Sequence, residues 1–205
     1  MENLSERRSM AVSASNAERL TALARTTKQR EYARDFVATW RDHVTWDRAP
    51  MREAVRLPGE FIVEEEDVLA YNLALGETDP LLVDPEYARV HAPGGTVVVH
   101  PLFTTSIGFW LAAPGTPLSW TRTPGARNPF QRVVIREPIK IGDRLSLTVE
   151  NTDRYIRRGK HYLSAHVVMS DQRGAVKAES WATLILPANH DEARAFATAL
   201  NDTRP

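Results

Sequence analysis

Apolar and polar positions divide the chain into three zones, of which the first has a helical pattern. Apolar residues recur at steps of three and four, at Leu20 and Leu23 and again from Tyr32 to Val44. Such steps place the apolar side chains on one face of a helix. Residues 1–56 are therefore predicted to form an N-terminal helical extension, whose apolar face lies on the same chain or on a partner subunit.

The second zone, residues 57–130, mixes short elements with turns around one strongly apolar segment. Its pattern predicts a short strand at residues 60–65 and helices at residues 66–75 and 85–90. The segment 101–112, PLFTTSIGFWLA, is apolar almost all round. A helix without a polar face is normally buried, so this segment is predicted to be a central helix covered by the rest of the fold.

The third zone, residues 131–187, has the pattern of long strands. Leu145, Leu147 and Val149 alternate with polar residues, as in a strand with one buried face. Two further runs flank the turn at residues 171–174, which predicts a β-hairpin. The predicted strands cover residues 132–137, the stretch around 145–149, residues 161–170 and residues 175–186.

The order of these elements predicts an α+β fold in which one curved antiparallel sheet wraps around the central apolar helix. The main domain then covers residues 57–187, and residues 188–205 form a C-terminal helix and tail. A single sheet of this kind leaves exposed strand edges, which pairing with a second subunit would cover. We therefore expect a dimer.

Composition narrows the chemistry and the partners. The 205 residues include 26 basic and 26 acidic residues and no cysteine. Balanced charge argues against nucleic-acid and membrane partners, because binding to their phosphates needs a surplus of positive charge. Without cysteine there is no thiolate zinc site, iron–sulfur cluster or cysteine nucleophile. We expect neither a metal nor a redox cofactor, and the lack of a recognisable signal or membrane segment favours a cytoplasmic protein.

Three segments carry motifs of a known family: residues 67–88, DVLAYNLALGETDPLLVDPEYA, and two shorter segments that begin at Val99 and Arg136. They resemble the MaoC-like hot-dog family of R-specific enoyl-CoA hydratases and 3-hydroxyacyl-thioester dehydratases, and residues 67–88 resemble its hydratase motif. Residues 99–102, VHPL, are similar to the segment that opens the family's central helix, and residues 136–145, REPIKIGDRL, to its Pro-x-x-x-Gly-Asp strand. The resemblance covers roughly residues 57–187. It implies a hot-dog fold and a substrate that is an acyl-CoA or a carrier-bound acyl group.

The catalytic residues of that family are altered in this chain. The resemblance implies an aspartate and a histidine that activate water, and a glycine whose backbone N–H binds the thioester carbonyl. Glu77 stands at the position of the aspartate, Asp79 at that of a neighbouring asparagine, Leu82 at that of the histidine and Pro101 at that of the glycine. Leucine cannot exchange protons and proline has no N–H. The usual acid–base set is therefore incomplete.

The catalytic candidates are Glu77, Asp79 and His100. Hydration of an enoyl thioester needs a group that takes a proton from water and a donor for the carbonyl, where negative charge develops. Glu77 is the main candidate carboxylate, and His100 precedes the central helix, where it can replace the missing imidazole or the missing N–H donor. Asp79 is alternatively a turn residue of an Asp-Pro pair, and His100 a structural histidine.

Four further residues are candidates for substrate binding. His91 lies in the predicted loop over the site, and Trp110 of the central helix can line an acyl pocket, although apolar residues there are more often core. Arg157 and Arg158 form a basic turn that suits the phosphates of coenzyme A or the acidic face of a carrier protein. A solvated turn is the alternative.

Three functions remain open at this point. The first is a hydratase or dehydratase of acyl thioesters with a non-standard acid–base set. The second is a non-catalytic subunit that forms the substrate tunnel of a hetero-oligomeric dehydratase, which Leu82 and Pro101 favour. The third is a hot-dog thioesterase. The expected partner subunit is a second copy or a related hot-dog chain.

Overall fold

The computed structural model describes residues 22–31 and 42–202, and the chain divides into two compact units after Ala38. In the first unit, Thr26 and Gln29 each accept a hydrogen bond from the other's backbone N–H, at 3.2 Å in both cases. This reciprocal pair is a capping box, and a helical turn follows it at residues 27–31. Most of the helix predicted over residues 32–44 lies outside the described residues.

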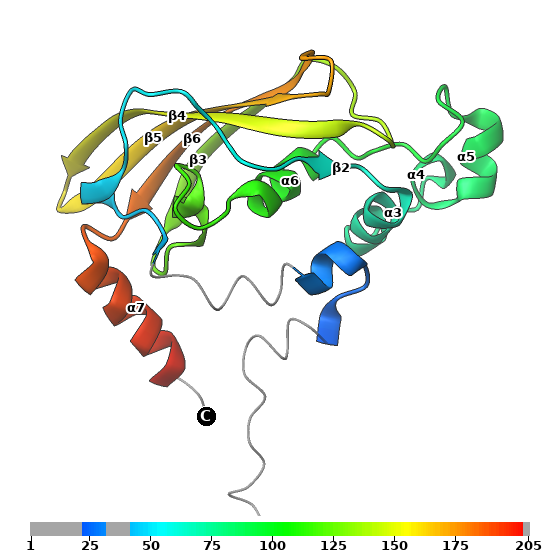
Figure 1. Ribbon diagram of the computed structural model, residues 1–205. Coiled ribbons are helices and arrows are strands. Elements are labelled where there is room, and N and C mark those ends of the chain that lie inside the picture. The colour runs from blue at the N-terminus through cyan, green and yellow to red at the C-terminus, as the bar shows by residue number, and fades with distance from the viewer. Residues whose placement is uncertain (1–21, 32–41, 203–205) are drawn as a thin grey trace, which may run out of the picture. The chain divides into compact units, whose positions relative to one another are not determined.

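The second unit is built on an antiparallel sheet in the order β1-β4-β5-β6-β3, with β2 also paired to β4 (Figure 1). Leu145, Leu147 and Val149 of β4 are buried, as the alternation predicted, but the residues between them are not exposed, because Ser146 is also buried and Thr148 is half-buried. The long strands are β3 (Arg127–Ile135), β4 (Arg144–Arg157), β5 (Lys160–Ser170) and β6 (Val176–Leu186), and the short ones are β1 (Val55–Arg56) and β2 (Phe61–Ile62).

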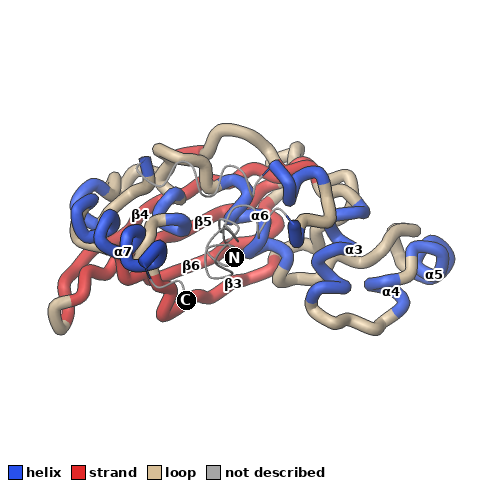
Figure 2. Tube along the Cα trace, turned by 90° about the horizontal axis from the view of Figure 1, so that it is seen from below, coloured by secondary structure: helices blue, strands red, loops and turns tan. Residues whose placement is uncertain are grey.

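One helix of this unit lies on the sheet, and three others lie together beside it. Figure 2 shows α6 (Phe103–Leu111) lying across the inner face of the sheet, while α3, α4 and α5 lie together at one end of it. The remaining helices are α3 (Glu65–Ala74), α4 (Pro80–Val83), α5 (Pro85–His91) and α7 (His190–Asp202), with 3-10 turns η2 (Trp46–Arg48) and η3 (Ser119–Arg122). None of the helices described is long and apolar enough to cross a bilayer.

The core lies between α6 and the inner face of the sheet. Ile107 is fully buried, as are Leu145, Val149 and Leu163 on the facing strands. The helix is not covered all round, however, because Phe109 is 38% exposed. One side of α6 therefore packs on the sheet, and the other side remains partly exposed in the single chain.

Residues 46–56 differ from the predicted helical extension. They hold η2 and β1 and belong to the same unit as the sheet. Val55 pairs with Val149 at the outer side of β4, and the indole N–H of Trp46 donates to the backbone oxygen of Tyr162 at 2.9 Å. A strand of two residues has no measurable periodicity, so its pairing could not be read from the pattern.

Candidate functional site

The loop that carries Glu77 is shaped by the end of α3. Gly76 has a φ of 78°, and its N–H donates to the oxygen of Leu73 at 3.0 Å, while the N–H of Glu77 donates to the oxygen of Asn72 at 3.2 Å. This is a left-handed glycine after a helix end, a conformation that glycine adopts at low cost. The reversal turns the chain out of the helix and presents Glu77 beside the start of α6.

Glu77 and His100 meet across this loop. The Oε1 atom of Glu77 lies 3.6 Å from Nε2 of His100, and their side chains are 31% and 21% exposed. The other ring nitrogen of His100, Nδ1, accepts the backbone N–H of Leu102 at 3.1 Å. A ring nitrogen that accepts carries no proton, so the neutral imidazole has its proton on Nε2, facing the carboxylate.

The backbone N–H groups at the start of α6 are already engaged. Pro101 has none, and the N–H of Leu102 is bonded to the His100 ring. The N–H groups of Phe103 and Thr104 donate to the oxygens of His100 and Pro101 at 2.9 and 3.4 Å. A substrate carbonyl at this position would therefore need a side-chain donor, and the Nε2–H of His100 is the one the geometry offers.

Tyr71 of α3 is a neighbour of this pair that the sequence did not single out. Its ring centroid lies 6.1 Å from that of His100 and 5.0 Å from that of Phe103. Burial raises the pKa of the Tyr71 hydroxyl, and a side-chain hydrogen bond with Ser106 acts in the opposite direction. A tyrosine on the inward side of a helix calls for a polar partner, which was the available signal, but its partner on α6 is visible only in the structure.

Asn72 links α3 by hydrogen bonds to Leu82, after the loop that carries Glu77, and to Val98, before α6. It is fully buried, and its Nδ2 donates to the backbone oxygens of Leu82 and Val98 at 2.8 and 3.1 Å. One side chain thus joins three parts of the chain that surround the Glu77–His100 pair.

Replacing Asn72 with Leu is expected to lower the free energy of unfolding by about 1–3 kcal/mol, because the partly buried backbone oxygens of Leu82 and Val98 lose their donor. Denaturant unfolding followed by circular dichroism measures the difference. Leu73→Ala is the control, because Leu73 is 59% exposed on the same helix and is expected to change stability by no more than about 0.5 kcal/mol. Equal stability of Asn72→Leu and the unmodified chain would contradict the role of Asn72.

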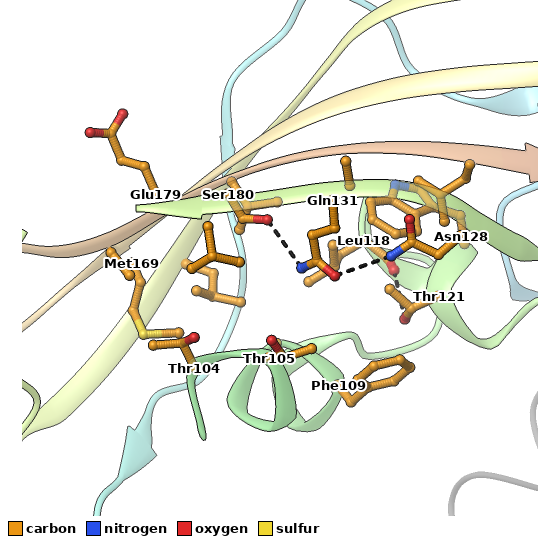
Figure 3. A pocket seen from close by; sticks show the side chains of 18 of the residues that line it. Thr104, Thr105, Phe109, Leu118, Thr121, Asn128, Gln131, Met169, Glu179 and Ser180 are labelled. Carbon is orange, nitrogen blue, oxygen red and sulfur yellow. Dashed lines mark hydrogen bonds between the residues drawn. The ribbon is translucent and has the colours of Figure 1, made fainter. Parts of the chain in front are cut away.

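A cavity of about 220 Å³ lies between α6 and the inner face of the sheet (Figure 3). Its walls include Thr104 and Thr105 in the first turn of α6, Gln131 of β3 and Ser180 of β6. Glu77 and His100 do not line it, although His100 precedes Thr104 by only four residues. Among the described residues the cavity is lined by α6 from its first turn onward, and the Glu77–His100 pair lies outside that lining.

The remaining candidates from α4 to α6 occupy other places. Asp79 is exposed and caps α4, where its carboxylate accepts the N–H of Leu81 at 2.9 Å. His91 is exposed at the end of α5, and its ring stacks on Tyr87 with centroids 4.0 Å apart. Trp110 is half-buried and packs edge-on against Phe61 of β2 at 5.8 Å, rather than lining the cavity.

Arg157 and Arg158 are remote from the Glu77–His100 pair within one chain. They are exposed at the β4–β5 turn, which Figure 1 shows at the opposite end of the sheet from α3. β2 pairs with Leu145 at the beginning of β4, and the twelve residues from there to Arg157 span roughly 40 Å at about 3.3 Å each. The structure therefore does not bring these arginines to the pair.

No group of three or more side chains suited to a metal ion occurs within residues 22–31 and 42–202. The chemistry available at Glu77 and His100 is that of a carboxylate acceptor beside an imidazole donor.

This chain is similar to known proteins in sequence and in fold. A protein of Clavibacter michiganensis called UPF0336 protein is 29% identical over 132 residues, which cover 62% of this chain and 85% of the relative. The unliganded R-hydratase PhaJ1 of Pseudomonas aeruginosa has a TM-score of 0.55 at 16% identity, covering 72% of this chain and 88% of its own.

A second similar structure is the C-terminally truncated HadBC complex of Mycobacterium tuberculosis, a (3R)-hydroxyacyl-ACP dehydratase. It has a TM-score of 0.55 at 20% identity, covering 67% of this chain and 98% of its own. At these identities the solved structures show the fold, which is the hot-dog fold predicted from the sequence. The family model described as FAS1-like, dehydratase domain region, matches residues 54–180, more than half of the chain. The chain thus belongs to the FAS1-like dehydratase domain family.

Proposed function

We propose that this protein is a hydratase or dehydratase of acyl thioesters in which Glu77 is the general base and acid. The observation that carries the proposal is the approach of Glu77 to His100, 3.6 Å between Oε1 and Nε2 in a partly buried site beside the start of α6. Membership of a dehydratase family supports the same chemistry. The expectation of a cytoplasmic enzyme without a metal or redox cofactor is part of the proposal.

In the hydration direction, the carboxylate of Glu77 takes a proton from water while the water oxygen forms its bond to the β carbon of the enoyl thioester. The electron pair of the double bond moves toward the thioester carbonyl, and a proton then returns to the α carbon. The 3.6 Å separation exceeds a direct hydrogen bond. The Nε2–H of His100 is thus available to the carbonyl oxygen, where the negative charge develops.

The roles of the other candidates follow from their positions. In this proposal Asp79 holds α4 and takes no proton, and His91 and Trp110 shape the surroundings without touching the reacting atoms. Arg157 and Arg158 lie far from the pair of their own chain, so in this proposal they bind substrate only if dimerisation places them beside the site of the partner subunit. We propose a dimer, of two copies or with a related hot-dog chain, and the fold's likeness to the HadBC complex supports such pairing.

A second candidate function is that of a tunnel-forming subunit without activity of its own. The absence of a free backbone donor among the described residues at the start of α6 favours it, together with Leu82 and Pro101 at the motif positions. The distinction from the first proposal rests on whether the Glu77–His100 pair turns over substrate.

The purified full chain is expected to convert enoyl-CoA thioesters of four to ten carbons into 3-hydroxyacyl-CoA. Loss of the enoyl absorbance measures the rate, mass spectrometry identifies the product and a thiol reagent measures released coenzyme A. Sedimentation of the same sample reports whether the chain is a dimer. Release of free thiol without hydration would favour a thioesterase, and lack of any turnover would favour the tunnel-forming subunit.

A further inference from the structure

Three polar side chains, those of Asn128, Gln131 and Ser180, lie in a row along one side of the cavity beneath the sheet. The amide of Gln131 is hydrogen-bonded to the hydroxyl of Ser180 at 3.2 Å and to the amide of Asn128 at 3.1 Å. Figure 3 shows the Gln131 side chain reaching from β3 toward α6, with Thr105 on the facing wall, while the carboxylate of Glu179 points away. Apolar side chains such as Leu147 and Leu184 make up much of the remaining wall.

The side chain of Gln131 and that of Thr105 on the facing wall have donors and acceptors that no described residue uses. A glutamine amide has two N–H donors and an oxygen that accepts two bonds, and Gln131 uses only part of this on Ser180 and Asn128. Thr105 is half-buried, and its hydroxyl makes no hydrogen bond with any other described residue. Polar groups on both walls therefore face the same space.

A purely aliphatic acyl chain fits such a cavity poorly. Gln131 is exposed in the single chain and Thr105 is half-buried. An aliphatic chain laid over them would displace their water without replacing its hydrogen bonds, and polar groups that are covered and unpaired are costly. A site that hydrogen-bonds a substrate oxygen discriminates strongly against the analogue that lacks it, whereas an apolar pocket discriminates weakly. The lining thus matches an acyl group that is apolar along most of its length and has one oxygen function.

We propose that the acyl part of the substrate carries a hydroxyl or keto group beyond the reacting carbons, and that Gln131 and Thr105 bind this oxygen inside the cavity. The inference rests on the proposed function for the thioester end of the substrate. The cavity reaches Thr104 in the first turn of α6, four residues after His100. The inference requires that the acyl group enter the cavity from this end while its thioester lies at the Glu77–His100 pair.

The test compares matched thioesters in which a hydroxyl is exchanged for a methyl group of similar size. One pair is 8-hydroxyoct-2-enoyl-CoA and non-2-enoyl-CoA, and a second pair is shorter by two carbons. For at least one pair, the full chain is expected to prefer the hydroxylated member by about tenfold or more in kcat/KM. Gln131→Leu and Thr105→Val are expected to remove most of this preference by slowing turnover of the hydroxylated member and raising turnover of the methyl analogue, whose chain then no longer covers unpaired polar groups.

Thr148→Val is the control, because Thr148 lies on β4 outside the cavity lining. Calorimetric binding of the saturated hydroxylated and methyl pairs gives a readout that does not depend on turnover. Equal or better use of the methyl analogues by an active chain overturns the inference and leaves the proposed function standing. If the chain turns over no substrate but binds the hydroxylated analogue selectively, and Gln131→Leu loses that selectivity, the cavity assignment is supported and the proposed function is overturned. Absence of turnover without selective binding overturns both.

Discussion

Replacing Glu77 with Gln is expected to lower kcat for enoyl-CoA hydration by about 10²–10⁴-fold, the usual contribution of general acid–base catalysis. Glutamine keeps the size and hydrogen-bonding reach of the side chain but cannot take a proton from water. Because Glu77 is 31% exposed and its only ion-pair partner in the described part of the chain is His100, the substitution is expected to leave thermal unfolding within a few degrees. Steady-state rates and a melting curve on the same preparation measure both quantities.

Two further variants test whether the carboxylate of Glu77 itself is needed. Glu77→Asp keeps the carboxylate but withdraws it by one methylene, so it is expected to retain a measurable fraction of the activity that Glu77→Gln loses. Glu86→Gln removes an exposed carboxylate of α5 that pairs with Arg89, and it is expected to leave kcat unchanged. Full activity of Glu77→Gln, with hydration still observed, would show that another group acts as the base.

The long elements of the fold could be predicted from the sequence because each carries its own signal. Alternation from Leu145 to Val149 marks β4, and the apolar segment 101–112 marks α6, since these patterns decide which side of an element is buried. The short elements could not be predicted in the same way. β1 and β2 have two residues each and exist only through pairing with β4, which is a property of the tertiary structure.

The same contrast holds for the candidate site, where residues in a recognisable motif could be predicted and residues defined by tertiary contacts could not. Glu77 and His100 were found through the resemblance to a motif, and their approach to 3.6 Å follows from the order of α3 and α6 in that fold. Tyr71 and the cavity residue Gln131 could not be found, because each acquires its significance from an element distant in sequence. The arginines of the β4–β5 turn were expected near the substrate because the length of β4 was unknown.

A second cluster of charges was not anticipated and lies among the loops that join β3 to β4 and β5 to β6. The ammonium group of Lys177 is 2% exposed and lies 3.3 Å from Glu137, 3.7 Å from Asp143 and 3.5 Å from Asp171. The carboxylate of Asp171 also accepts the N–H groups of Arg173 and Ala175 at 2.9 and 3.0 Å, which forms the β5–β6 turn. A single buried cation thus lies among three acidic groups from two loops.

The pKa of Asp171 shows how firmly its charge is held. Burial alone would raise it, but the backbone and side-chain hydrogen bonds from Arg173 and the N–H of Ala175 outweigh burial and lower the pKa to about 2. The usual value for an unfolded chain is about 3.9. Stability contributed by the ionised Asp171 is therefore fully present above about pH 4, and it is lost as the pH falls toward 2.

Replacing Lys177 with Met is expected to lower the free energy of unfolding at pH 7 by about 3–5 kcal/mol, the range for removing one partner of a buried ion pair. Methionine fills the space of the lysine stem but leaves Asp171 and Asp143 without their shared cation. Denaturant unfolding measures the loss, and Lys140→Met, at an exposed position of the β3–β4 loop, is expected to change stability by no more than about 0.5 kcal/mol.

The pH dependence distinguishes lost charge pairing from lost packing in Lys177→Met. In the variant Asp171 keeps its contact with Arg173, while Asp143 and Glu137 lose the ammonium group of Lys177. Acid protonates carboxylates that have lost this partner, so the stability difference from the unmodified chain is expected to shrink as the pH falls from 7 toward 4. Across this range Asp171 of the unmodified chain stays ionised, because its pKa is about 2. A difference that stays constant from pH 7 to pH 4 would contradict the electrostatic role of Lys177 and would leave side-chain packing as the cause.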